Sequence, residues 1–185
     1  MYTDVDKKTL LDIARKSIRY GLDHHCALPI VINDYPPQLV IPRATFVTLK
    51  IAGDLRGCIG TLNAYRPLVE DVAMNAYAAA FRDPRFPALQ TNEFGQLHYH
   101  LSILNPTEPL QVQTEVELLA QLRPGIDGLV LEDQQHRSTF LPAVWESLPE
   151  PPQFIAHLKQ KAGLPVSYWS KTIHFERYSV EDIES

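Results

Sequence analysis

Two adjacent stretches with the character of β-strands constrain this fold more than any other feature of the sequence. Residues 45–51 read TFVTLKI and alternate apolar with polar side chains, which is typical of a half-buried strand. Residues 55–62 read LRGCIGTL, and the intervening Gly53 and Asp54 suit a two-residue hairpin turn because glycine tolerates the positive φ that such a turn needs. We therefore expect a β-hairpin over about residues 44–62, with Cys58 in the middle of its second strand.

The rest of the chain supplies helices and strands that can cover and extend this hairpin. Apolar residues recur at helical spacing over residues 6–22, and a second helix should open at Pro67 and stop at Asp83, the residue before Pro84. Residues 97–104 alternate again and predict a strand. The second half repeats this order more loosely, with a short helix at 115–122, a hairpin at 129–141, a helix at 152–162, a strand at 172–178 and an acidic tail or edge strand at 179–185.

Hairpin, helix and strand thus occur twice, over about residues 44–104 and 115–178. Hairpins impose antiparallel pairing, and each helix must cover a sheet face. We predict an α+β fold with mostly antiparallel sheet, packed helices and a weak internal duplication. The 185 residues are expected to form one domain, with room for a small second lobe.

Composition narrows the classes of function. Hydrophobic residues make up 45% of the chain and charged residues 21%, as in ordinary globular proteins. A net charge of −5 argues against general binding to nucleic acid or to anionic lipid. We find no signal-peptide pattern and no apolar run long enough to span a bilayer, so we expect a cytoplasmic protein with no membrane partner, whose Cys26 and Cys58 stay reduced.

The strand that holds Cys58 is the candidate site. With a turn at Gly53 and Asp54, Leu49 would lie opposite Cys58, and Arg56 would share its face about 6 to 7 Å along the strand, near enough to favour a thiolate or hold an anion. Gly57 and Gly60 are typical of a bulge or of a ligand or backbone that approaches closely. The alternative is that Cys58 is an unreactive core residue and the glycines make room for the helix after Pro67.

Histidines offer two further candidates for chemistry. His24, His25 and Cys26 are consecutive, but adjacent side chains point apart and no further ligand follows at a usual spacing, so no metal site is predicted. His98 and His100 share a strand face and would approach the hairpin if the strands are neighbours. They are equally consistent with half-exposed polar positions.

The runs LRGCIGTL, FRDPRFPAL, GIDGLVLE and FLPAVW resemble the AMMECR-type domain family, whose bacterial members are called AmmeMemoRadiSam system protein A. The resemblance covers nearly the whole chain and implies a duplicated α+β arrangement. It supports Cys58 and Arg56 as catalytic residues. It also suggests a set of ligand-binding positions: Gly57, Gly60, Thr61, Arg82, Asp83, Arg85, Phe86, Glu108 and Asp127. His98 and His100 depart from the family's pattern, which weakens a Cys–His pair.

Two functions are compatible with these features. The first is an enzyme or enzyme component in which Cys58 and Arg56 bind or act on an anionic small molecule or a modified macromolecule; convergence of Arg56, Arg82 and Arg85 would build an anion pocket. The resemblance implies Memo-like and radical S-adenosylmethionine proteins as its pathway partners. The second is a non-catalytic adaptor that docks partners through the proline-bounded loop at residues 82–87. RNA binding by the arginines is poorly supported by the net charge.

Overall fold

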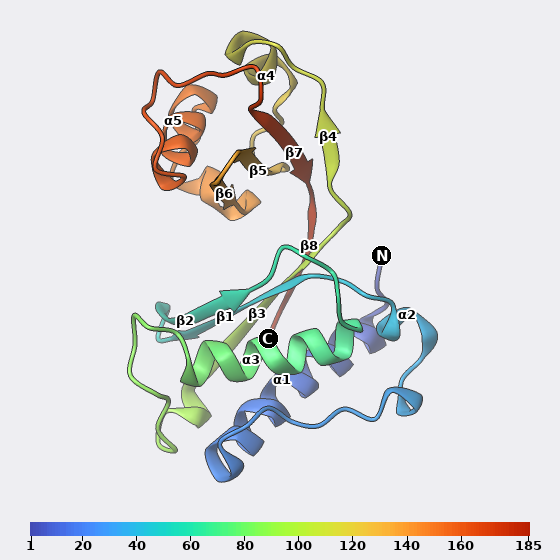
Figure 1. Cartoon of the computed structure of the whole chain (residues 1–185). Coiled ribbons are helices and arrows are strands. Elements are labelled where there is room, and N and C mark those ends of the chain that lie inside the picture. The colour runs from blue at the N-terminus through green and yellow to red at the C-terminus, as the bar shows by residue number, and fades with distance from the viewer. The chain divides into compact units, whose positions relative to one another are not determined.

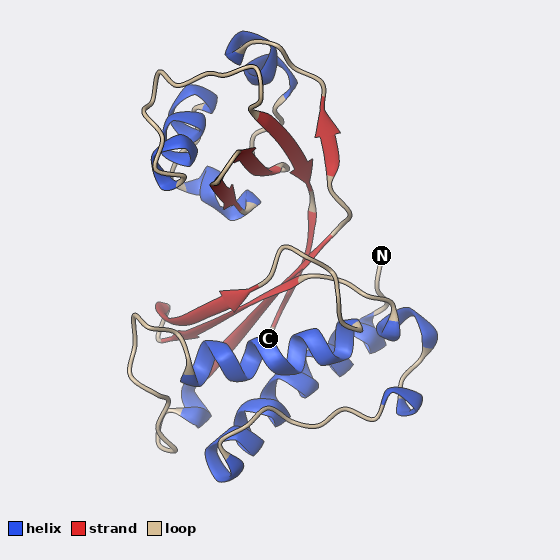
Figure 2. Cartoon of the chain, in the orientation of Figure 1, coloured by secondary structure: helices blue, strands red, loops and turns tan.

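The computed structural model describes residues 1–185, which divide into two compact units. The first unit comprises Met1–Leu104 and Glu181–Ser185, and the second comprises Asn105–Val180. Each unit contains one four-stranded sheet, and the predicted α+β class is confirmed (Figures 1 and 2). No helix combines the length and the apolar character needed to cross a membrane.

The first unit packs its two long helices on one face of its sheet (Figure 1). The strand order is β2-β1-β3-β8, with β1 paired antiparallel to both β2 and β3. Its helices and strands are α1 (Asp4–His24), α2 (Pro37–Val40), β1 (Thr45–Ile51), β2 (Asp54–Gly60), α3 (Leu68–Phe81), β3 (Leu97–Leu104) and β8 (Val180–Glu184), with short 3-10 turns at Ile32–Asp34 and Phe94–Gln96.

Helix α1 begins at a capping box, in which the Thr3 hydroxyl accepts a hydrogen bond from the Asp6 amide while the Asp6 carboxylate accepts one from the Thr3 amide. The helix therefore starts two residues earlier than the hydrophobic spacing indicates. It ends at His24, with His25 in the left-handed conformation as the C-cap. Helix α3 ends at Phe81, consistent with the predicted stop before Pro84.

A buried carboxylate ties the start of β1 to α3. Asp71 of α3 is fully buried and accepts hydrogen bonds from the amide and the hydroxyl of Thr45, at 2.9 and 2.7 Å. Asn75 donates to the same Asp71 oxygen at 2.8 Å, and Arg66 pairs with the other oxygen at 2.7 Å. Because each donor compensates for burial of the charge, this network fixes the helix along the strand.

The second unit repeats the arrangement of the first. Its hairpin strands β5 (Gly128–Asp133) and β6 (His136–Phe140) are followed by α5 (Pro151–Lys161) and by β7 (His174–Tyr178), which pairs with the first hairpin strand, as β3 pairs with β1. Strand β4 (Glu108–Leu110) pairs with β7 and completes the order β4-β7-β5-β6. The unit also contains α4 (Glu115–Gln121) and a 3-10 turn at Pro142–Glu146.

The core of the second unit is aromatic. The rings of Trp145 and Phe154 stack with centroids 3.8 Å apart, and Phe140 meets Phe154 edge-on at 5.2 Å. Lys159 of α5 is fully buried and forms an ion pair with Glu115. The buried ammonium is thereby neutralised, which its burial requires.

The turn of the first hairpin lies one residue earlier than predicted. Ile51 pairs with Asp54, so the two turn residues are Ala52 and Gly53, with φ of 52° and 89°. Positive φ at both positions is the geometry of a type I′ turn, whose twist matches that of antiparallel strands. The expected Gly53–Asp54 turn is therefore wrong, although the hairpin itself is confirmed.

Candidate functional site around Cys58

A β-bulge decides the direction of the Cys58 side chain. Leu49 pairs with Gly57 and Lys50 with Leu55, which leaves Arg56 as an extra residue without a partner in β1. Cys58 consequently lies opposite Thr48, not opposite Leu49 as predicted. A shift of one residue moves a strand's side chains to the other face, so Cys58 points away from the face that α1 and α3 cover.

Cys58 is half-buried, and the protein holds its sulfur and both of its backbone polar groups. The Thr48 hydroxyl donates a hydrogen bond to the sulfur at 3.2 Å. The Cys58 amide donates to the carboxylate of Asp83 at 2.9 Å, and its carbonyl accepts from the guanidinium of Arg85 at 3.2 Å. Since β2 is an edge strand, the 82–87 loop satisfies backbone groups that no strand pairs.

Asp83 and Arg85 form an ion pair beside the cysteine. Their closest nitrogen and oxygen atoms are 2.7 Å apart, and Asp83 is buried whereas 54% of the Arg85 side chain is exposed. Hydrogen bonds from Arg85, and then from the Cys58 amide, hold the pKa of Asp83 well below its usual value, although burial opposes the shift. Asp83 is thus a carboxylate at neutral pH, and Arg85 is the cation next to Cys58.

Arg56 points elsewhere. Its guanidinium donates to both oxygens of Glu93, at 2.7 and 3.1 Å, and to the carbonyl of Pro87 at 3.0 Å. Arg56 is 9% exposed, and its ion pair lowers the pKa of Glu93. The bulge explains why Arg56 does not lie beside the thiol as we expected from the strand alternation.

The three candidate arginines do not converge on one anion pocket. Arg82 lies over the ring of Tyr77, with its guanidinium carbon 5.2 Å from the centroid. Arg56 and Arg85 approach the ring of Phe86 at 6.0 and 5.5 Å, but each is paired with its own carboxylate. The Phe86 ring is therefore near both guanidinium groups, while each arginine keeps its own carboxylate partner.

The motif glycines lie where neighbouring groups approach closely. A Cβ at Gly57 would be 2.0 Å from the carbonyl oxygen of Ala79 in α3, so this glycine makes room for the helix, which was the alternative that we considered. A Cβ at Gly60 would be 2.3 Å from the ring of Phe46. The Thr61 amide donates a hydrogen bond to the Thr45 carbonyl at 3.1 Å, which continues the pairing of the hairpin strands beyond Gly60. The Thr61 hydroxyl is buried without a hydrogen-bond partner.

His100 lies in the same row of the sheet as Cys58. It pairs with Thr48 across β1 and β3, and its Nε2 is 2.8 Å from Asp182, whose carboxylate also accepts from Ser102 at 2.6 Å. The hydrogen bond to Asp182 raises the pKa of His100, although burial opposes this. Cys58 and His100 flank Thr48 on opposite sides, about 10 Å apart at two strand spacings, so they do not form a direct pair.

The two remaining candidates belong to the second unit. Glu108 is exposed and pairs with Arg177 at 3.3 Å. Asp127 is fully buried, accepts hydrogen bonds from Arg123, and offers its backbone carbonyl to the indole of Trp145 at 2.7 Å. Within that unit, both residues make contacts that stabilise the fold.

No three side chains of the His, Cys, Asp and Glu types are grouped closely enough to hold a metal ion. His24 stacks on Tyr20 at the end of α1, with ring centroids 3.9 Å apart. Cys26 and Cys58 are both free thiols, and Cys26 is exposed.

Sequence reasoning missed three residues that shape the site. Thr48 was assigned to the opposite face because of the register error, whereas Glu93 and Asp182 come from distant segments. The one available signal for Glu93 was that a buried arginine needs an acidic partner. Nothing in the local pattern around Asp182 indicates its contact with His100.

Comparisons with known proteins show relatives along almost the whole chain. A sequence model of the AMMECR1 family matches residues 11–183. A protein of Methanothermobacter thermautotrophicus is 35% identical over 165 residues, which cover 85% of this chain and 82% of that protein. Protein MJ0810 of Methanocaldococcus jannaschii is 36% identical over 166 residues, with 84% and 81% covered.

A solved structure shares the fold. The uncharacterized protein PH0010 from Pyrococcus horikoshii superimposes with a TM-score of 0.88 at 30% identity, over 97% of this chain and 91% of that one. Together with the two sequence relatives and the family match, this establishes that the chain belongs to the AMMECR1 family.

Proposed function

We propose that this protein is an enzyme or an enzyme component in which the Cys58 thiol and the Arg85 guanidinium bind the anionic group of a small molecule or of a modified macromolecule. The proposal rests on the contact between two sequence motifs, residues 55–62 and residues 82–87, at Cys58. The 82–87 loop binds both backbone polar groups of Cys58, a partly exposed residue, and brings the cation of Arg85 next to it.

Arg85 has hydrogen-bonding capacity left for such a ligand. Its Nε and Nη2 atoms donate to Asp83 and to the Cys58 carbonyl, while Nη1 makes no hydrogen bond. A guanidinium whose orientation is fixed by a buried carboxylate is preorganised to receive a carboxylate or phosphate. Arg85 thus takes the role that we expected Arg56 to play.

The test is alkylation of Cys58 by a neutral and an anionic reagent of similar size, iodoacetamide and iodoacetate. Cys26→Ala leaves Cys58 as the sole thiol, and Cys58→Ala leaves the exposed Cys26 as the reference. We expect iodoacetamide at neutral pH to modify Cys58 about fivefold faster than free cysteine, because the Arg85 guanidinium can hold the carbonyl oxygen of the reagent beside the sulfur. We also expect the rate ratio of iodoacetate to iodoacetamide to be higher for Cys58 than for Cys26.

Arg85→Gln should lower this ratio, whereas Arg82→Gln, an equal change of charge in the same loop, should leave it unchanged. A Cys58 that reacts no faster than free cysteine would end the proposal that its thiol is activated. A ratio equal to that of Cys26 would end the proposal of an anion site.

The alternative function is an adaptor that docks partners through the 82–87 loop, and one observation favours it. Arg82, Pro84, Arg85 and Pro87 are all exposed, and the two prolines and the Asp83 contacts stiffen this surface, which lowers the entropy lost on docking. The partners implied by the resemblance are Memo-like and radical S-adenosylmethionine proteins. Arg82→Glu with Arg85→Glu should abolish their co-purification and Cys58→Ser should preserve it, whereas retention after the double charge reversal would contradict docking by this loop.

A further inference from the structure

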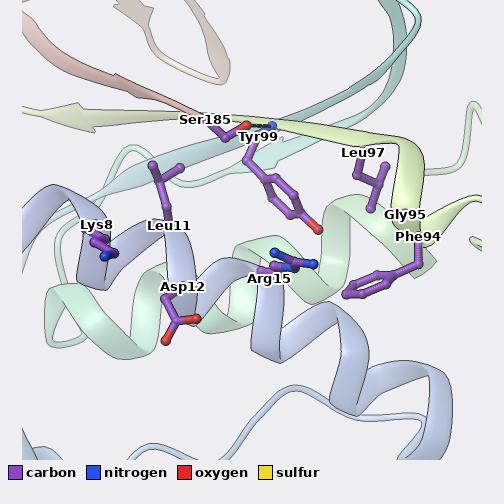
Figure 3. A pocket seen from close by; sticks show the side chains of 9 residues that line it. All are labelled: Lys8, Leu11, Asp12, Arg15, Phe94, Gly95, Leu97, Tyr99 and Ser185. Atoms are coloured by element: carbon purple, nitrogen blue, oxygen red, sulfur yellow. Dashed lines mark hydrogen bonds between the residues drawn. The ribbon is translucent and has the colours of Figure 1, made fainter.

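The geometry points to a second ligand site in the first unit: a pocket between α1 and β3 that takes a small organic anion, with a carboxylate or phosphate group on a flat apolar body. The pocket has a volume of 330 Å³. Lys8, Leu11 and Arg15 line it from one face of α1, at the spacing that brings helical side chains into a row. Phe94, Leu97 and Tyr99 line it from the segment that leads into β3 and from β3 itself (Figure 3).

The first observation concerns the hydroxyl of Tyr99. Tyr99 is 7% exposed, and its hydroxyl oxygen is shielded from solvent without any hydrogen-bond partner. Buried polar groups are almost always hydrogen-bonded, so an unpaired hydroxyl in the wall of a pocket marks a missing partner. Burial raises the pKa of Tyr99 to about 12, and the hydroxyl therefore remains a donor at neutral pH.

The second observation is a cation that lacks an acidic partner. Arg15 forms no ion pair with a carboxylate, because the neighbouring Asp12 is paired with Lys16 at 2.7 Å. In Figure 3 the Tyr99 hydroxyl is directed towards the Arg15 guanidinium. Arg15 also opposes the rise in the Tyr99 pKa, as expected of a nearby positive charge.

The Tyr99 hydroxyl oxygen accepts no hydrogen bond from Arg15, so an acceptor between the phenol and the guanidinium would pair with both groups. An oxygen of a carboxylate or phosphate accepts from a phenol and from a guanidinium at once, and these charge-assisted hydrogen bonds are stronger than neutral ones. Lys8, Asp12 and Ser185 also line the pocket. Because Asp12 is paired with Lys16, Lys8 and Arg15 leave the side chains of the lining with a positive charge.

The remaining walls suit an apolar body. The guanidinium carbon of Arg15 lies 5.8 Å from the centroid of the Phe94 ring, so the cation and the ring are next to each other. Leu11 and Leu97 supply further apolar surface. Mixed walls of this kind are typical of sites in which apolar contacts give affinity and a few polar groups fix orientation.

This site is independent of Cys58. Tyr99 pairs with Leu49, which belongs to the core, whereas the next residue, His100, pairs with Thr48 on the other face of the sheet. The two sites can therefore be tested with separate variants.

The experiment is a titration of the full chain followed by the backbone amide resonances of residues 94–99. The probes are benzoate, its neutral analogue benzamide, and inorganic phosphate. We expect benzoate to shift these resonances and to bind about tenfold tighter than either benzamide, which lacks the charge, or phosphate, which lacks the apolar body.

Three variants make the test specific. Arg15→Gln and Tyr99→Phe should each weaken benzoate binding by about fivefold or more. Arg43→Gln, the same charge change in the same unit at a residue outside the pocket lining, should leave binding unchanged. Tyr99→Phe should not lower the stability of the free protein, because its hydroxyl has no partner to lose.

The proposal is overturned if benzoate and benzamide bind equally, or if phosphate matches benzoate. It is also overturned if Tyr99→Phe leaves benzoate affinity unchanged, or if Arg43→Gln weakens binding as much as Arg15→Gln does.

Discussion

Thr48 and Cys58, ten positions apart on neighbouring strands, are joined by a 3.2 Å hydrogen bond from the threonine hydroxyl to the cysteine sulfur. The backbone amide and carbonyl of Cys58 point outwards to the 82–87 loop, so they make no hydrogen bonds to Thr48. Thr48 and Cys58 are therefore a non-hydrogen-bonded pair of the antiparallel ladder, the type of pair whose side chains lie closest together. The bulge at Arg56 creates this pair.

Loss of the Thr48 hydroxyl should make Cys58 less reactive. Thr48→Val keeps the shape of the side chain and removes the donor, and we expect alkylation of Cys58 by iodoacetamide at pH 7 to slow by about threefold, because the hydrogen bond holds the sulfur in position. Thr9→Val, which removes an exposed hydroxyl in α1, is the matched control and should have no effect. An unchanged rate in Thr48→Val would show that the hydrogen bond does not affect the reactivity of Cys58.

Arg56 should contribute to folding and leave the thiol unaffected. Glu93→Gln removes the acidic partner of a buried guanidinium, and we expect the free energy of unfolding to fall by about 2 kcal/mol, less than for a fully buried pair because Glu93 is partly exposed. Chemical denaturation measures this loss. The alkylation rate of Cys58 in the folded variant should equal that of the wild type. A slower rate would show that Arg56 affects the reactivity of Cys58.

Gly57 should not tolerate a side chain. In Gly57→Ala the new Cβ would lie 2.0 Å from the Ala79 carbonyl oxygen, so α3 or β2 must move, and we expect a loss of about 3 kcal/mol or more in the free energy of unfolding. Gly95→Ala, where no atom lies within 4 Å of the new Cβ, should be neutral. Equal stabilities of the two variants would contradict the close packing of α3 on β2.

His100 should make stability depend on pH near neutrality. Its folded pKa is raised, chiefly by the hydrogen bond to Asp182, so its contribution is fully present below the unfolded value near 6.5 and is lost as pH rises through the folded value. Because Asp182 is about half-exposed, we expect a modest loss of about 0.5 kcal/mol between pH 5.5 and 8.5.

Urea unfolding of the wild type and of His100→Gln at both pH values isolates this contribution from that of the other histidines. Glutamine keeps a donor for Asp182 but does not titrate. Parallel pH profiles for the two proteins would show that His100 does not carry the effect.

The sequence predicts the bounds and the buried face of a strand best where the alternation of apolar and polar residues is long and regular. Strand β3 has the predicted bounds, and its alternate residues Leu97, Tyr99, Leu101 and Ile103 are buried, because eight alternating residues leave one orientation that buries the apolar set. Strand β4 was not predicted, since it has three residues and contains Pro109, which reads as a strand breaker. Its pairing with β7 depends on partners far along the chain.

The site was harder to predict than the fold. Ala52 is not a usual residue for positive φ, and a bulge leaves little mark in the sequence, so the face of Cys58 was assigned incorrectly. The pairing of Arg56 with Glu93 spans 37 positions. The 82–87 loop stands out in the sequence as a motif, but its contact with Cys58 depends on how α3 returns the chain to β2.

The binding of Asp83 and Arg85 to the backbone of Cys58 has a consequence for association between copies of the chain. An incoming β-strand could extend the sheet beyond β2 only by displacing this ion pair. The buried Asp83 carboxylate would then lose its hydrogen-bond partners. The loop therefore protects the fold against edge-to-edge aggregation at the same place where it presents the thiol.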